Sequence, residues 1–255
     1  MSQKSKYGQT VEDPLAHFKA IPWCARVMYV LLSLCPRPAQ IPLYKILTFC
    51  LYRDDSAVVS LQIPDRNPTA SREAALVNET LNTPDTVRAC VVVVRKLKPT
   101  PETLGGGETP AKPFLQLAGL LDLGQGVNGY PGTVHGGFFN VMLDEIMGST
   151  VNSYTEGSGE CISLLLFSCS PSGDRWLICG AGQLAFTAYL NVKFKKPLHT
   201  PQIVIVRGQI KKVEGRKLFV KGRCEDRDGM PFAEADGLWV TVAAHKEEGP
   251  ITGKI

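Results

Sequence analysis

Residues 138–147 limit most strictly what this chain can fold into. Placed on a helix, they are apolar nearly all round, broken only by Asn140, Asp144 and Glu145. A helix that is apolar on every side has to be surrounded by the rest of the protein. The remaining chain must therefore supply a large surface that covers this helix.

The chain after residue 183 has the pattern of strands. Leu190, Val192 and Phe194 alternate with polar residues, which is typical of a half-buried strand. Further strands are expected over 203–213, 217–224 and 233–243, joined by tight turns at 214–215 and 228–229. Upstream, strands are expected over 57–63, 87–97 and 114–123, and a helix over 71–82 with Ser71 as its cap. This order predicts an α+β fold in which an antiparallel sheet wraps around one long central helix.

The N-terminal apolar run at 27–35 is too short to cross a bilayer, which takes roughly 18 apolar residues. We expect a helix here to dock onto the body of the protein, and we expect no integral membrane segment. Residues 98–113 are rich in Pro and Gly and are expected to form a surface linker.

Cysteine and histidine usage excludes several classes of protein. The eight cysteines contain no C-x-x-C pair, and there are only four histidines. This argues against a disulfide scaffold, a zinc knuckle and a metal site, and it indicates reduced thiols inside a cell. We expect a cytoplasmic protein, with a mitochondrial location as the alternative.

Basic residues are concentrated between positions 193 and 223, where ten Lys and Arg accompany one acid, Glu214. Such a stretch serves nucleic acid, a membrane surface or a phosphorylated ligand, or it is the solvated face of a strand. No nucleic-acid recognition motif accompanies it, so we expect no nucleic-acid partner.

The start of the buried helix carries the candidate chemistry. Its sequence, His135-Gly136-Gly137, leaves backbone N–H groups open at the positive end of the helix dipole, where a developing oxyanion is stabilised. Asp144 follows Gly137 by seven residues, which places it two turns along on nearly the same face. Burial would raise the pKa of this carboxyl, which can then activate water or attack a carbonyl. Glu145 points about 100° away and is expected to make a structural or interface contact.

His135-Gly-Gly with Asp144 at the ninth position following resembles the signature of the hotdog-fold acyl-CoA thioesterases. The segment 186–197, Phe-Thr-Ala-Tyr-Leu-Asn-Val-Lys-Phe-Lys-Lys-Pro, is similar to a strand of the phenylacetate-pathway and thioesterase-superfamily-member branch. The segments 213–217 and 233–235 match as well. The resemblance covers about residues 113–243 and implies a hotdog fold that forms dimers or dimers of dimers by edge-to-edge pairing of sheets.

The resemblance also implies roles for individual residues. Asp144 would be the general base or nucleophile. The Gly137 N–H, with that of Gly136, would polarise the thioester carbonyl, and His135 would orient the loop or the substrate. Thr187, supplied by the partner subunit, would position the water.

The substrate-binding residues follow from the same resemblance. Asn128 would contact the thioester. Asn191 and the basic residues Lys193, Lys195 and Lys196 would bind the CoA part of the substrate, whose phosphates suit point-charge contacts.

On this reading the protein hydrolyses an acyl-CoA or carrier-bound acyl thioester and needs no metal or redox cofactor. A hotdog dehydratase or hydratase using His135 and a non-catalytic acyl-thioester binder are the alternatives, and a role in a biosynthetic pathway stays open. We divide the chain into an N-terminal extension (1–110), whose first strands can join the sheet, a hotdog domain (111–246) and a tail (247–255). An insertion at 155–182 distinguishes the domain from its relatives and is expected to shape the acyl pocket or to disturb the site.

Overall fold

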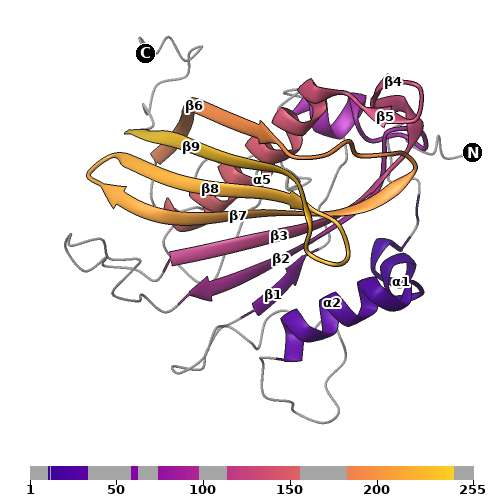
Figure 1. The fold of residues 1–255 in the computed structure, drawn as a ribbon. Helices are drawn as coiled ribbons and strands as arrows, with labels where there is room; N and C mark the ends of the chain where they lie inside the picture. Colours follow the sequence, from indigo (N-terminus) through magenta and orange to yellow (C-terminus); the bar gives the residue numbers. More distant parts are fainter. Residues whose placement is uncertain are drawn as a thin grey trace, which may run out of the picture.

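A seven-stranded antiparallel sheet lies against one long helix, α5 (Gly136–Thr155), in this computed structural model (Figure 1). The structure describes residues 11, 13–33, 59–62, 74–97, 114–155 and 183–243. Helix α5 contacts five of the strands, which places it along the centre of the sheet. The arrangement is that of the hotdog fold, as the resemblance implied.

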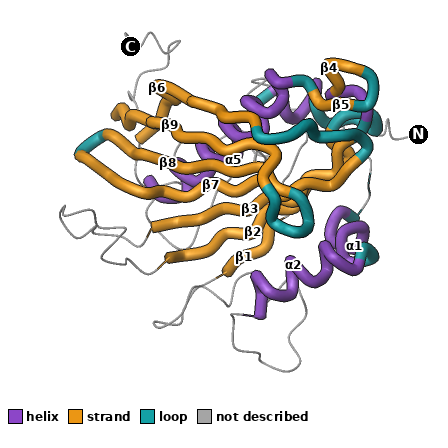
Figure 2. The backbone as a smooth tube through the Cα atoms, in the orientation of Figure 1, coloured by secondary structure: helices purple, strands orange, loops and turns teal. Residues whose placement is uncertain are grey.

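The strands of this sheet run in an order that differs from their order in the chain (Figures 1 and 2). Across the sheet they are β1 (Val59–Gln62), β2 (Val87–Leu97), β3 (Phe114–Leu123), β7 (Gln202–Glu214), β8 (Lys217–Glu225), β9 (Pro231–Ala243) and β6 (Gln183–Phe194). Every neighbouring pair is antiparallel. The predicted bounds of β2 and β3 are confirmed, and the other strands lie within a few residues of their predicted ranges. Because β6 comes last, it forms one edge of the sheet.

Helix α5 buries one face along most of its length, while the face that carries Asn140, Asp144 and Gly148 is only half-buried, so the sequence predicted its burial in part. The helix is also longer than the apolar run alone indicates. Its last turns are rich in Ser and Thr, whose side chains return to the helix backbone. The Thr150 hydroxyl donates to the Ile146 carbonyl at 2.7 Å, and the Thr155 hydroxyl donates to that of Asn152 at 3.0 Å. These bonds satisfy the two threonine hydroxyl groups locally, whereas the buried Ser153 hydroxyl has no hydrogen bond within the described residues.

A row of small residues lets α5 approach the sheet closely. Gly208 of β7 pairs with Gly222 of β8, which pairs with Ala235 of β9. A methyl group added at Gly222 would lie 2.3 Å from the Met147 sulfur. One added at Gly208 would lie 2.6 Å from the Thr150 hydroxyl. The helix and the strands thus meet where the sheet has no side chains.

The N-terminal helices α1 (Pro14–Lys19) and α2 (Pro22–Ser33) cover part of the other face of the sheet (Figure 1). The docking predicted for this region is therefore confirmed. The contact is a second apolar cluster separate from the one around α5, formed by Phe18, Cys24, Met28, Ala89, Val91, Val93, Ala118, Leu120 and Ile205.

A buried carboxylate adds a polar anchor between α1 and the sheet. Asp122 of β3 accepts from Arg88 of β2 at 2.5 Å and pairs with the His17 ring at 2.9 Å. Strands β1 and β2 come from the predicted extension and pair within the main sheet, while the domain boundaries stay a prediction.

The segment predicted as a helix over 71–82 differs in the structure. Its described part, from residue 74, holds only a five-residue π-helical turn, η1 (Leu76–Thr80). Ala74 has a φ of +53°, which is incompatible with a right-handed helix and prevents a regular start there. The Ser71 cap, the linker at 98–113, the insertion from residue 156 to 182 and the tail at 247–255 lie outside the described residues.

Between β3 and α5 the chain forms short irregular elements, as its Gly, Pro and Asn content predicts. They are η2 (Gln125–Val127), β4 (Asn128–Tyr130) and β5 (Thr133–Val134). In the part of the chain that the structure describes, no helix combines the length and the apolar character needed to cross a membrane.

Candidate active site

Asp144 and Thr187, both predicted for the site, are brought together. The Thr187 hydroxyl of β6 donates to Asp144 Oδ1 of α5 at 2.9 Å. The resemblance placed the threonine on a partner subunit, whereas here both residues belong to one chain. The contact arises because β6 runs beside α5 at the edge of the sheet.

Asp144 is half-buried, and its surroundings act on its acidity in opposite directions. Burial raises the pKa of this carboxyl above its ordinary value, and the hydrogen bond from Thr187 lowers it in part. A raised pKa makes a carboxylate a stronger base. The neighbouring Glu145 is affected more strongly, because burial and the Asp144 charge together raise its pKa to about 7.

His135 forms a cap at the start of α5, which sequence reasoning missed. The Gly137 N–H donates to His135 Nδ1 at 2.9 Å, so one of the two predicted oxyanion donors is engaged. This bond requires an imidazole with an unprotonated Nδ1. The Gly136 N–H has no hydrogen bond within the described residues. Both the ring and the two glycines are exposed.

Asn128 is tied to a loop on the far side of the site. Its side-chain oxygen accepts from the Thr200 hydroxyl at 2.6 Å, and its backbone pairs with Val134 in the small sheet of β4 and β5. The structure gives Asn128 a defined partner in the loop after β6 but no contact with Asp144.

Asn191 and Lys193 lie on the opposite face of β6 from Thr187. Leu190 and Val192 pack against the core around α5, and side chains alternate between the two faces of a strand. The predicted CoA-binding residues of β6 are therefore not gathered around Asp144. Among the described residues Lys193 has no hydrogen bond or ion pair within 4 Å.

Lys195 and Lys196, which follow β6, are each paired with a carboxylate. Lys195 lies 2.9 Å from Glu234, and Lys196 lies 2.7 Å from Asp226 and over the ring of Phe232.

Carboxylates neutralise much of the basic stretch. Six of its ten cations have ion pairs, namely Lys195, Lys196, Arg207, Lys212, Lys221 and Arg223. Most of the partner acids lie outside the stretch, on or beside β8 and β9. The charge that looks unbalanced along the sequence is balanced across the strands, which favours the solvated-face interpretation for most of these residues.

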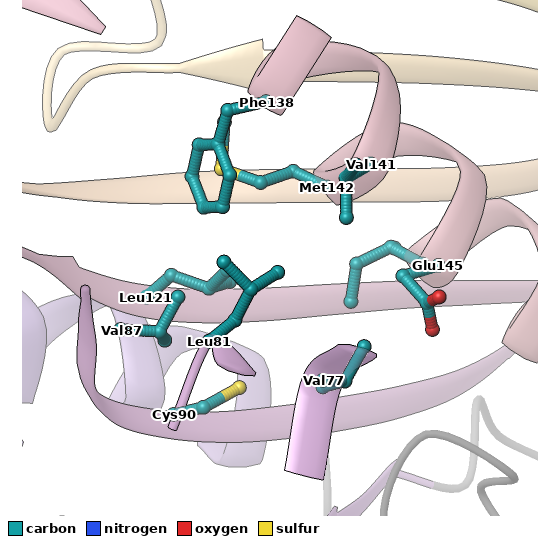
Figure 3. Close-up of a pocket in the computed structure, with 10 residues that line it drawn as sticks. Val77, Leu81, Val87, Cys90, Leu121, Phe138, Val141, Met142 and Glu145 are labelled. Carbon is teal, nitrogen blue, oxygen red and sulfur yellow. The ribbon is translucent and has the colours of Figure 1, made fainter. Parts of the chain in front are cut away.

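A pocket that no motif predicted opens at the face of α5 that carries Glu145 (Figure 3). Its walls come from η1, β2, β3 and α5, and its lining residues are Val77, Leu81, Val87, Cys90, Leu121, Phe138, Val141, Met142, Glu145 and Ile146. Half of them precede residue 131, in segments whose pairing with the helix no local pattern reveals. The signal available in the sequence was Glu145 itself, a carboxyl inside an apolar run.

Several known proteins are similar to this chain. Verlamelin biosynthesis protein B from Lecanicillium sp is 29% identical over 185 residues, which span 70% of this chain and 78% of that protein. Acyl-coenzyme A thioesterase THEM4 of Mus musculus is 30% identical over 128 residues, or 50% of this chain. This chain covers only 44% of that relative's length.

Among solved structures, the BH2602 protein from Bacillus halodurans, crystallised with CoA, is 23% identical with a TM-score of 0.36. The match covers 49% of this chain and 66% of that one. A family model described as the thioesterase superfamily matches residues 131–233. This match spans α5 and most of the strands that cover it, so the chain is similar to the thioesterase superfamily over its helix and the adjoining sheet.

Proposed function

We propose that this protein hydrolyses an acyl-CoA thioester to a free acid and CoA thiol, with Asp144 as the base or nucleophile. The contact between Asp144 and Thr187, two turns along a buried helix that opens with His-Gly-Gly, carries the proposal. A half-buried carboxylate with a raised pKa and a fixed hydroxyl neighbour is a suitable proton acceptor.

In the proposed reaction the thioester carbonyl oxygen accepts a hydrogen bond from the open Gly136 N–H. When Asp144 acts as base, it takes a proton from water, and the resulting hydroxide adds to the carbonyl carbon. The tetrahedral intermediate collapses, the carbon–sulfur bond breaks, and the thiolate leaves with the proton returned by Asp144. When Asp144 acts as nucleophile, it forms a mixed anhydride that water then hydrolyses.

The Gly137 N–H, which His135 occupies in this structure, is proposed as the second hydrogen-bond donor to the oxyanion. Rotation of the imidazole away from Gly137 frees a second N–H at the positive end of α5 for the oxyanion. His135 is therefore proposed as a positioning residue that controls one of the two donors. No metal or redox cofactor has a place in this reaction.

We further propose that the active form is a homodimer paired through β6. This strand is an edge of the sheet, and its large apolar side chains Phe186, Tyr189 and Phe194 are 49%, 42% and 55% exposed. An exposed apolar edge strand is a template for pairing with another strand. The Asp144 and Thr187 pair lies directly behind this edge.

The test is thiol and acid release from short, long and aromatic acyl-CoAs by the wild type and by Asp144→Asn. Removing the base is expected to lower kcat by roughly 100- to 10,000-fold. The exposed Asp236 of β9 is the matched control, and Asp236→Asn should keep at least half of the wild-type rate. The acid should be followed by mass, because the protein's own eight cysteines react with thiol dyes.

Equal rates in the wild type and in Asp144→Asn would refute the proposed site. Formation of an enoyl product without thiol release would instead identify a dehydratase or hydratase. Tight acyl-CoA binding with no product would identify a binding module. If only carrier-bound acyl groups are cleaved, the thioesterase assignment stands with a different substrate.

A further inference from the structure

Glu145 is the one ionisable carboxyl in the wall of the pocket described above (Figure 3). The other lining side chains are aliphatic, aromatic or sulfur-containing. Figure 3 shows the carboxyl group on the side of α5 where Val77 of η1 also lies. The pocket is thus an apolar site with a single polar group on one side.

Within the described residues this half-buried carboxyl has neither a hydrogen bond nor an ion pair. Taking a polar group out of water without a compensating hydrogen bond is unfavourable, and a leucine in its place would fit the apolar walls without that cost. The Glu145 carboxyl lowers the stability of the folded protein, and its presence is explained if a bound ligand supplies the missing hydrogen-bond partner.

The position of the pocket relates it to the acyl part of the proposed substrate. Asp144 and Glu145 are consecutive on α5, so their side chains diverge by about 100° and serve adjoining faces of the helix. The apolar walls suit a hydrocarbon chain and not the phosphorylated, strongly polar CoA. An acyl chain whose thioester lies at Asp144 would therefore have this pocket beside it.

The protonation state of Glu145 limits which polar substituent of an acyl chain this wall can bind. Burial and Asp144 bring the pKa of Glu145 to about 7, so near neutral pH the carboxyl both donates and accepts. A neutral hydroxyl matches both roles. A charged group would itself be desolvated against the apolar walls.

We propose that Glu145 recognises a hydroxyl group on the acyl chain, which makes this protein selective for hydroxylated acyl thioesters. The inference rests on the proposed function, because it concerns the acyl part of the same substrate. Walls from η1 and β2 (Val77, Leu81, Val87 and Cys90) lie outside the segment that matches the family model. The selectivity is thus a property of how this chain's N-terminal part meets α5.

The experiment uses pairs of acyl-CoAs of equal length, with and without one hydroxyl, the hydroxyl being moved along the chain from pair to pair. The ratio of kcat/KM within each pair is measured for the wild type, Glu145→Gln and Glu145→Leu. The wild type should favour the hydroxylated member at one position by roughly 10- to 100-fold, the usual value of a buried hydrogen bond. Glu145→Gln should keep part of this preference, because an amide also donates and accepts.

Glu145→Leu should abolish the preference while it still cleaves the unsubstituted chains, which shows that the variant is folded. Glu214→Leu, at the last residue of β7 and outside the pocket lining, is the matched control and should keep the wild-type ratio. A ratio near one at every hydroxyl position in the wild type, or one that survives in Glu145→Leu, would overturn the inference.

Binding measurements test the recognition of the hydroxyl group independently of the proposed hydrolysis. Dissociation constants for the same pairs are measured on Asp144→Asn, which does not turn the ligands over. If the wild type releases no thiol but Asp144→Asn binds the hydroxylated chain more tightly, hydrolysis is refuted and the recognition by Glu145 is upheld. If thiol is released and neither binding nor turnover distinguishes the pairs, hydrolysis is upheld and the recognition is refuted.

Discussion

Thr187 acts on Asp144 through one hydrogen bond, and the direction of its effect follows from which form it stabilises. A hydroxyl that donates to a carboxylate favours the ionised state, so the bond lowers a pKa that burial has raised. Thr187→Val removes the donor and keeps the shape. The pKa of Asp144 should then rise, and a larger part of the base should be protonated at a given pH.

The expected result for Thr187→Val is an acid limb of the kcat/KM profile shifted to higher pH, by up to about one unit. The rate at high pH, where Asp144 is ionised in both proteins, should fall less than the rate at pH 6. Thr187→Ser, which restores the donor, should return the limb to its wild-type position. A uniform loss of rate at all pH values would instead indicate a role in placing substrate or water.

Glu145 should make the protein less stable as the pH rises. Its pKa is about 7 in the folded state against an ordinary value of 4.5, so the folded state holds a proton that the unfolded state has lost. Stability falls with pH wherever the folded state binds more protons, here between about pH 4.5 and 7.

Glu145→Gln should therefore change the free energy of unfolding little at pH 4.5 and raise it at pH 8. The gain should be about 2 kcal/mol, which allows for the partial exposure of the side chain. Denaturant unfolding at the two pH values measures it. The exposed Glu214 gives the control, since Glu214→Gln should show no such pH-dependent gain. An equal effect of Glu145→Gln at both pH values would contradict the assignment.

At the scale of elements, the contact between α5 and the sheet depends on positions without side chains. At Gly208 an added methyl group would meet the helix backbone, 3.0 Å from the Ile146 carbonyl oxygen and 3.1 Å from the Met147 Cα. At Gly222 it would meet mainly the Met147 side chain, which can rotate away. A Gly→Ala substitution should therefore lower the free energy of unfolding more at Gly208 of β7 than at Gly222 of β8.

Gly208→Ala should lower the free energy of unfolding by about 2 to 3 kcal/mol, the usual cost of overpacking a core. Gly222→Ala should cost less, and Met147→Ala in the same chain should recover part of the loss. Chemical denaturation of the single and double variants tests this ordering. A larger cost at Gly222 than at Gly208 would mean that the helix backbone moves more easily than the methionine.

The bounds of helices and strands could be predicted from the sequence better than the side-chain contacts between residues distant in the chain. Strands β2 and β3 could be bounded from β-branched and apolar runs, because a strand leaves a local pattern. The resemblance selected both Asp144 and Thr187 for the site, but it placed the threonine on a partner subunit, so their contact within one chain was not predicted. The ion pairs of the basic stretch, such as Arg207 with Glu225, join residues distant in the chain and leave no such pattern. The cap of Gly137 by His135 depends on a side-chain rotamer, which spacing does not give.

For the whole molecule, the exposed edge strand β6 leads to a prediction about assembly. Phe186→Asp places a charge on this edge, where it would be desolvated and repelled by its symmetry-related copy in a β6-paired dimer. Light scattering should then show a monomer where the wild type shows a dimer. Met230→Asp alters a comparably exposed apolar residue, in the turn before β9, and should leave the dimer intact.

The order of strands in the sheet also determines where the gene for this protein can be shortened. The family match starts after β3 and ends at residue 233, the third residue of β9. A fragment cut at those limits would lose β1, β2 and β3, leave β7 as a bare edge, and remove most of the strand that joins β8 to β6. The segment that matches the family model is thus no autonomous folding unit. Expression limits for this chain have to include the strand neighbours and the docked helices α1 and α2, from residue 13 to residue 243, and cannot be drawn from the extent of its similarity to others.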